Sequence, residues 1–173
     1  DIGAYDGING SNSYFFEKDL GWRGLLIEPS RKQFLNLKNN RTSECVNSAI
    51  SNKIQRIDFV DVVSGYTQMS GLKQEYYNDN YKLIQTDLNS VTEIYEIETS
   101  TFSKLVNEEN IDYLSIDIEG GELNLLHSID FNFYKIKVIS IENNKPNDIC
   151  YNNFLYEKGF TFFDFCGNDE IYY

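Results

Sequence analysis

Short apolar segments alternate with helix-forming segments along most of this 173-residue chain. The apolar segments predict strands at 25–28, 45–50, 54–63, 93–98, 113–117, 137–142, 160–165 and 170–173. The intervening segments predict helices at about 12–20, from residue 30 onward, and at 101–108, 122–128 and 147–158. Such alternation is typical of a mainly parallel, doubly wound sheet. We therefore expect one α/β domain over residues 1–173, with an antiparallel pair of strands at its C-terminal end.

Local signals support these boundaries. Ser11 or Asn12 can cap the first helix, and Gly159 is placed to end the last one. Residues 30–33, Ser-Arg-Lys-Gln, fit a capping box. The helix that follows is expected to bury Phe34, Leu35 and Leu37.

The strand that should lead into the first glycine-rich turn is nearly absent, because the sequence starts at about its last residue. In a sheet of this kind that strand is central. We therefore expect a truncated first strand, or upstream residues that have been left out, and two neighbouring strands with exposed edges.

The charge of the chain bears on its partners. It carries 27 acidic and 15 basic residues, for a net charge of −12. Binding to nucleic acid depends on Lys and Arg, so this balance disfavours RNA and DNA and favours a neutral or sugar-like acceptor. The sequence contains no apolar run of 18 residues, so no membrane span is expected.

The cysteines and the single histidine predict no metal centre of their own. Cys45, Cys150 and Cys166 are far apart in sequence, which favours reduced thiols in a cytoplasmic protein. His127 is expected to be a partly buried structural residue. A zinc site therefore lacks ligands.

The first candidate site is the turn Asp1-Ile2-Gly3-Ala4-Tyr5-Asp6-Gly7. Its glycines, with Gly10, allow close approach of the backbone to a ligand, but their spacing differs from the G-x-G-x-x-G of a nicotinamide dinucleotide fold. Glu28 follows Gly7 by about 20 residues and ends the second strand, where an acid can accept both ribose hydroxyls of a cofactor. The alternative is an ordinary strand-terminal acid beside Pro29.

The second candidate site is residues 117–122, Asp-Ile-Glu-Gly-Gly-Glu, at the carboxyl end of a strand. Ligands of open α/β sheets bind at this end. Alternation places Asp117 and Glu119 on one side, where they could bind a cation, a sulfonium or hydroxyl groups. Alternatively, Glu119 and Glu122 only favour the N-terminus of the next helix through its dipole.

A third polar group, Glu142-Asn143-Asn144, also ends a strand. Asp117, Glu142 and Asn143 could form a magnesium site, loosely resembling that of catechol-type methyltransferases. The sequence favours a solvated polar turn over a bound ion, so magnesium is possible but not favoured.

Residues 64–90 are polar, rich in tyrosine and weakly periodic. We interpret them as an insertion or a lid. Tyr76, Tyr77 and Tyr81 could stack on a sugar face, or they could be ordinary loop tyrosines.

These motifs occur in an order that resembles the FkbM family of methyltransferases. The matching segments are DIGAYDGINGSNSYFFEKDLGWRGLLIEP, NSAIS, SGL, IDYLSIDIEGGELNLL and VISIENN, which span most of residues 1–144. The resemblance implies a Rossmann-like class I methyltransferase fold that binds S-adenosylmethionine. It also implies a small-molecule or glycan acceptor, since such enzymes typically methylate hydroxyl oxygens of sugars or secondary metabolites.

The resemblance assigns roles to particular residues. Asp117 and Glu119 would face the methyl transfer site as catalytic residues, with Asp117 as the first candidate for the base and Glu119 as the second. The cofactor-binding set would be Asp1, Gly3, Ala4, Tyr5, Gly7, Ser11, Glu28, Pro29, Ala49 and Asp117.

The sequence therefore predicts an S-adenosylmethionine-dependent O-methyltransferase. The alternatives are a magnesium-dependent O-methyltransferase of small molecules, a nucleotide-binding oxidoreductase and a catalytically inactive binding module. The segment 72–92 matches no motif, so acceptor identity and oligomeric state stay open.

Overall fold

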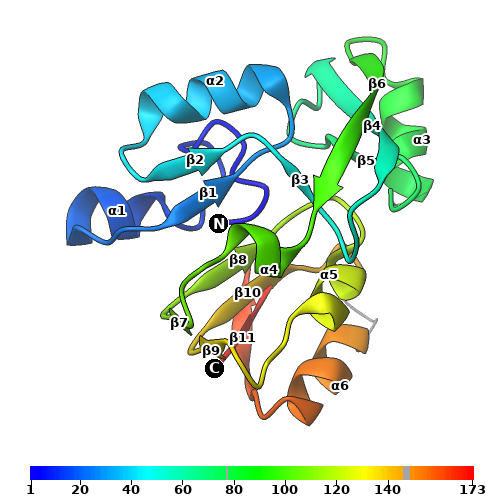
Figure 1. Cartoon of the computed structure of the whole chain (residues 1–173). Helices are drawn as coiled ribbons and strands as arrows, with labels where there is room; N and C mark the ends of the chain where they lie inside the picture. The colour runs from blue at the N-terminus through cyan, green and yellow to red at the C-terminus, as the bar shows by residue number, and fades with distance from the viewer. Residues whose placement is uncertain (77, 146–148) are drawn as a thin grey trace.

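A computed structural model describes residues 1–76, 78–145 and 149–173 (Figure 1). The larger sheet runs in the order β2, β1, Ile2, β8, β10, β12, β11. Its strands are β1 (Leu25–Ile27), β2 (Glu44–Val46), β8 (Leu114–Ile116), β10 (Ile139–Glu142), β11 (Phe162–Cys166) and β12 (Asp169–Tyr172). Neighbours are parallel up to β10, whereas β12 is antiparallel to both β10 and β11. The antiparallel C-terminal pair is thus confirmed.

Ile2 occupies the central place in this sheet. It forms parallel bridges to Ile27 on one side and to Ile116 on the other, and its side chain is buried. Its amide donates to the carbonyl of Ser115, and its carbonyl accepts from the amide of Asp117, both at 2.9 Å. One residue therefore joins β1 to β8, as expected of a truncated first strand, and the chain start lies between these strands in Figure 1.

A second sheet lies beside the first, in the order β3, β6, β4, β5. It comprises β3 (Ala49–Ile50), β4 (Arg56–Ser64), β5 (Gly71–Leu72) and β6 (Val91–Ser100). β4 is antiparallel to both β5 and β6. A further parallel pair joins β7 (Asn110–Ile111) to β9 (Lys135–Ile136). The expected single, mainly parallel sheet therefore describes only the larger one, because periodicity identifies a strand without identifying its partner.

The helices are α1 (Tyr14–Leu20), α2 (Arg31–Asn40), α3 (Asn78–Thr86), α4 (Phe102–Leu105), α5 (Glu122–Ser128) and α6 (Cys150–Glu157). α1 begins later than predicted, with Ser13 at its N-cap. The predicted start of the last helix at Asn147 lies outside the described residues. At α2 the Ser30 hydroxyl accepts from the Gln33 amide, which is one half of the predicted capping box. The other half is not formed, because the Ser30 amide donates to Glu28 and not to the Gln33 side chain.

The predicted buried face of α2 was partly wrong. Leu37 is fully buried and Phe34 half-buried, but the Leu35 side chain is 63% exposed. Gln33 is the residue that shares the buried face with Leu37, because positions four apart lie on one side of a helix.

The main core lies between the larger sheet, α5 and α6, and it includes Ile116, Leu125, Ile139 and Leu155. His127 packs edge-on against Phe154 with ring centroids 4.4 Å apart, but it is exposed, so the expected partial burial was wrong. Cys45, Cys150 and Cys166 are free thiols. Among the described residues, no helix has the length and apolar character needed to cross a membrane.

Candidate active site

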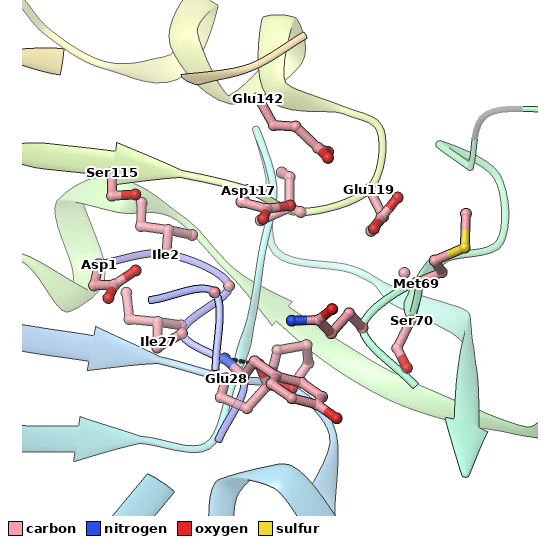
Figure 2. A pocket seen from close by; sticks show the side chains of 18 of the residues that line it. Asp1, Ile2, Ile27, Glu28, Met69, Ser70, Ser115, Asp117, Glu119 and Glu142 are labelled. Atoms are coloured by element: carbon pink, nitrogen blue, oxygen red, sulfur yellow. Dashed lines mark hydrogen bonds between the residues drawn. The ribbon is translucent and has the colours of Figure 1, made fainter. Parts of the chain in front are cut away.

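A cavity of about 370 Å³ opens at the carboxyl ends of the central strands (Figure 2). It is bounded by the N-terminal loop, by the residues that end β1, β8 and β10, and by residues 66–72, which comprise part of the loop after β4 and the whole of β5. Open α/β sheets bind ligands at this end because the loops there diverge. Two segments far apart in sequence, residues 1–12 and 66–72, thus line one cavity.

Most of the predicted site residues line this cavity. They are Asp1, Gly3, Ala4, Tyr5, Ser11, Glu28, Pro29, Ala49, Asp117, Glu119 and Glu142. Gly7 and Asn143 are not among the lining residues. Gly7 instead packs under the loop, where an added Cβ would lie 2.6 Å from Leu37 and 2.7 Å from Arg41.

The N-terminal loop passes directly over the end of β8. Gly3 has φ +84°, and a Cβ on it would lie 1.6 Å from the carbonyl oxygen of Asp117. Only glycine fits this crossing. Tyr5 follows with a positive φ of 49°, and its hydroxyl is 2.6 Å from the hydroxyl oxygen of Thr67.

Arg41 supports this loop and was not predicted from the sequence. Its guanidinium donates to the Gly7 carbonyl and the Ser11 hydroxyl, each at 3.1 Å, and its Nε donates to Glu17 at 2.9 Å. Ser11 and Ser13 in turn donate to the carboxylate of Asp1. A single arginine at the end of a surface helix carries no sequence signal for such a role.

Glu28 lies at the end of β1 and is 5% exposed. Its two oxygens accept from the amides of Tyr5 at 2.9 Å and Ser30 at 2.7 Å, so the carboxylate is fixed against the cavity. Burial raises the pKa of Glu28 to about 7, and the nearby Asp61 adds to the rise. An acid held in this way retains lone pairs for ligand hydroxyls.

The second cluster lies across the cavity from Glu28 (Figure 2). Asp117 ends β8, Glu119 follows in the next turn, and Glu142 ends β10. Each offers a carboxylate oxygen within 4.8 Å of the others. The parallel register of β8 and β10 brings them together, because both strands end at the same edge.

Glu119 is buried, Asp117 and Glu142 are half-buried, and the charges of the three carboxylates repel one another. Burial, followed by the charges of Glu142 and Asp169, raises the pKa of Asp117 well above its ordinary value. Burial and neighbouring carboxylates raise the pKa of Glu119 to about 8 and that of Glu142 to about 8. The three carboxyls therefore retain their protons to higher pH than free carboxyls do.

Glu122 has a structural role within this turn. It is 1% exposed, and its Oε1 accepts from the amides of Gly120 at 2.8 Å and Ile118 at 3.3 Å. The Tyr151 hydroxyl donates to its other oxygen at 3.3 Å. Glu122 thus shapes the turn that presents Glu119.

The groups that could hold a metal ion differ from the predicted set. Asp117 and Glu142 do come together, but the third carboxylate is Glu119. Asn143 is buried, and its amide nitrogen donates to Glu170 at 2.7 Å while its oxygen accepts from the Lys145 amide. Side chains alternate along a strand, so the cavity side falls to Glu142 and Asn144.

Part of the segment 64–90 forms one wall of the cavity, including Thr67, Gln68, Met69 and Ser70. Its helix α3 adds Asn80, whose amide donates to Glu119 at 2.8 Å. The tyrosine-rich composition indicated an insertion, but it did not identify these polar residues.

The tyrosines themselves have other roles. The Tyr76 side chain is buried in a cluster with Val60, Val62 and Ile84, and it packs edge-on against Tyr81. It is therefore not free to stack on a sugar. Tyr77 lies outside the described residues.

A comparison with protein families matched residues 1–164 to the family described as the methyltransferase FkbM domain. Searches of curated proteins and of solved structures gave no match. The match includes the N-terminal loop, Glu28 and the carboxylates across the cavity. The chain accordingly belongs to the FkbM methyltransferase family.

Proposed function

We propose that the protein transfers a methyl group from S-adenosylmethionine to a hydroxyl oxygen of a sugar or glycan. The observation that carries the proposal is a single cavity with Glu28 on one side and a cluster of carboxylates on the other. Glu28 is held by two backbone amides in a position suited to ribose hydroxyls, and the cluster consists of Asp117, Glu119 and Glu142. The membership in a methyltransferase family supports it.

The residues at the end of the cavity near Glu28 suit the chemistry of the cofactor. The cavity as a whole, at about 370 Å³, lies in the range of small-molecule sites, about 300–1,000 Å³. Glu28 would accept hydrogen bonds from the ribose hydroxyls, while Ala49 and Pro29 would border the adenine. Asp1, Gly3, Ala4 and Tyr5 would contact the methionine end, with Ser11 beside Asp1. Bound S-adenosylmethionine supplies a methyl group already activated on a sulfonium.

The opposite end would hold the acceptor. Asp117 is the proposed base or hydroxyl-orienting group, with Glu119 as the second candidate. Burial and neighbouring charges raise the pKa of both carboxyls, so each is a stronger base toward an alcohol proton once it is ionised. Orienting the hydroxyl for an in-line reaction supplies a further part of the rate.

The charge of the cavity supports an uncharged acceptor. None of the described residues that line the cavity is Lys, Arg or His. Five acidic residues line it, namely Asp1, Glu28, Asp117, Glu119 and Glu142. A phosphate or carboxylate on the acceptor would meet these acids without a counter-charge. Hydroxyl groups can donate to them instead.

The proposal is tested with Asp117→Asn. Removal of the base should lower turnover by about 10²–10⁴-fold and leave the affinity for S-adenosylmethionine unchanged. Turnover on a panel of sugars and glycans would be followed by mass spectrometry, with the exposed Asp164→Asn as control. Unchanged turnover would remove Asp117 from the mechanism.

The cofactor end is tested separately with Glu28→Ala. Hydrogen bonds to a charged group contribute about 1.5–3 kcal/mol, so S-adenosylmethionine should bind about tenfold more weakly or worse. Calorimetry measures this affinity directly. An unchanged affinity would refute the ribose role of Glu28.

A magnesium-dependent O-methyltransferase of small molecules is a second candidate. The proximity of Asp117, Glu119 and Glu142 favours it, since hard cations take carboxylate oxygens. In that case the three acids would be ligands, and the ion would lower the pKa of the acceptor hydroxyl. Turnover that is lost with a chelator and restored by Mg²⁺ would select this candidate over the metal-free one.

A further inference from the structure

Glu119 has an unusual backbone conformation for its residue type. Its φ is +60°, and Gly120 and Gly121 continue the turn with φ of +118° and +92°. Residues other than glycine, asparagine and aspartate rarely adopt this left-handed backbone conformation. Such a residue is held by its surroundings, so the contacts around Glu119 determine where its carboxylate lies.

The segment 64–90 surrounds this turn. A Cβ on Gly71 of β5 would lie 3.3 Å from the Cβ of Glu119 and 2.9 Å from the Tyr76 ring. A Cβ on Gly120 would lie 2.0 Å from the Glu75 carbonyl oxygen. The insertion and the turn are therefore in close contact, through backbone atoms at Gly120 and through the Glu119 side chain at Gly71.

Asn80 makes the polar contact to the carboxylate itself. Its Nδ2 donates to Oε2 of Glu119 at 2.8 Å, and Asn80 also lines the cavity. Its helix, α3, is anchored by Ile84, which is 2% exposed in the cluster with Val60 and Val62. The amide is thus presented from a fixed helix rather than from a loose loop.

The other acidic groups facing Glu119 are Asp117, Glu122 and Glu142. When ionised they oppose the charge of Glu119, and each can donate a hydrogen bond only while it is protonated. The Tyr76 hydroxyl is buried and has no hydrogen-bond partner among the described residues. Within this part of the chain, Asn80 supplies the side-chain donor that fixes the Glu119 carboxylate.

We propose that Asn80 is a positioning residue for methyl transfer: its amide holds one oxygen of Glu119 so that the other meets the acceptor hydroxyl. This inference rests on the proposed function. It assigns to the insertion the task of completing the acceptor side of the site. It also makes α3 part of the catalytic machinery although it is remote from Glu119 in sequence.

The test is a double-mutant cycle with Asn80→Ala, Glu119→Ala and the double variant. A hydrogen bond to a charged group predicts a fall in kcat of about 10- to 100-fold for Asn80→Ala, with the affinity for S-adenosylmethionine unchanged. In the Glu119→Ala background the same change should cost little, because the amide then has no carboxylate to hold.

Two further variants separate the amide donor from the shape of the side chain. Asn80→Asp keeps the size but replaces the donor with an acceptor, so its kcat should fall at least as far as that of Asn80→Ala. Asn89→Ala removes an exposed asparagine of the same segment and should leave kcat unchanged. Thermal melts establish that each variant is folded.

The outcomes distinguish this inference from the proposed function. A wild-type protein that methylates no sugar, glycan or small alcohol refutes the function, and the role of Asn80 falls with it. An active wild-type protein with additive effects in the cycle refutes the role of Asn80 alone. Full activity of Asn80→Asp does the same.

Discussion

At the scale of single residues, Gly3 and Glu28 have the strictest requirements. Gly3 is fixed by the crossing of two backbones, and Glu28 is fixed by two amide donors inside a buried site. Neither requirement tolerates a small change, because in each case backbone atoms rather than flexible side chains form the surroundings.

Gly3→Ala is expected to destabilise the protein severely. A side chain in the left-handed region costs about 1–2 kcal/mol, and here the Cβ would also collide with the Asp117 carbonyl. Gly21→Ala is the matched control, since Gly21 has φ +71° with no atom within 4 Å of the added Cβ. Urea denaturation should show a much larger loss for Gly3→Ala. Equal losses would contradict the close crossing.

At the scale of elements, Arg41 joins three parts of the N-terminal region. From the end of α2 it contacts Glu17 on α1 and the loop residues Gly7, Ser11 and Ser13. Its ion pair with Glu17 is buried, with the two side chains only 2% and 12% exposed. α1 itself buries no side chain, so this contact has a large part in its position.

Arg41→Ala should therefore destabilise the fold by about 3–5 kcal/mol, because the buried Glu17 carboxylate loses its positively charged partner. It should also weaken cofactor binding, because Ser11 and Asp1 lose their support. Arg56→Ala is the control: its pair with Glu96 has exposures of 71% and 58%, and its removal should cost about 1 kcal/mol or less. Similar unfolding midpoints for the two variants would argue against this role of Arg41.

The insertion is the element whose interpretation the structure changed most. It supplies β5, α3 and one wall of the cavity. Thr67 contacts Tyr5 of the N-terminal loop, and Asn80 contacts Glu119 in the carboxylate cluster across the cavity. The segment therefore contacts both halves of the proposed site.

At the scale of the whole molecule, buried acids make stability depend on pH. The folded protein holds a proton on Glu28 with a pKa of about 7, against an ordinary value of 4.5. Its contribution is complete below the lower value and is lost as pH rises through the higher one. The acids across the cavity, with raised pKa values of their own, act in the same direction.

We therefore expect the denaturant concentration at the unfolding midpoint of the ligand-free protein to decrease as the pH rises from about 5 to about 8. Glu28→Gln removes one titrating group, so its midpoint should fall less steeply over this interval. Chemical denaturation at several pH values measures both slopes. Identical slopes would exclude Glu28 as a source of the dependence.

The sequence alone determined most strands of the larger sheet and several of the acids that line the candidate site. Hydrophobic periodicity located the strands of the larger sheet and its antiparallel end, because a strand that is buried on one or both faces has apolar residues at a characteristic spacing. Glycines and acids at strand ends located Glu28, Asp117 and Glu119, because parallel strands present these ends at one edge.

Only the tertiary structure decided how distant segments meet. The antiparallel pairing of β4 with β6, the support of the loop by Arg41 and the contact of Asn80 with Glu119 each join residues more than 20 positions apart. The sequence predicted Asn143 as the third member of a metal-binding group, whereas the structure places Glu119 there. The difference depends on which side of the sheet each side chain faces. Such contacts depend on packing and register in three dimensions, and local residue patterns do not specify them.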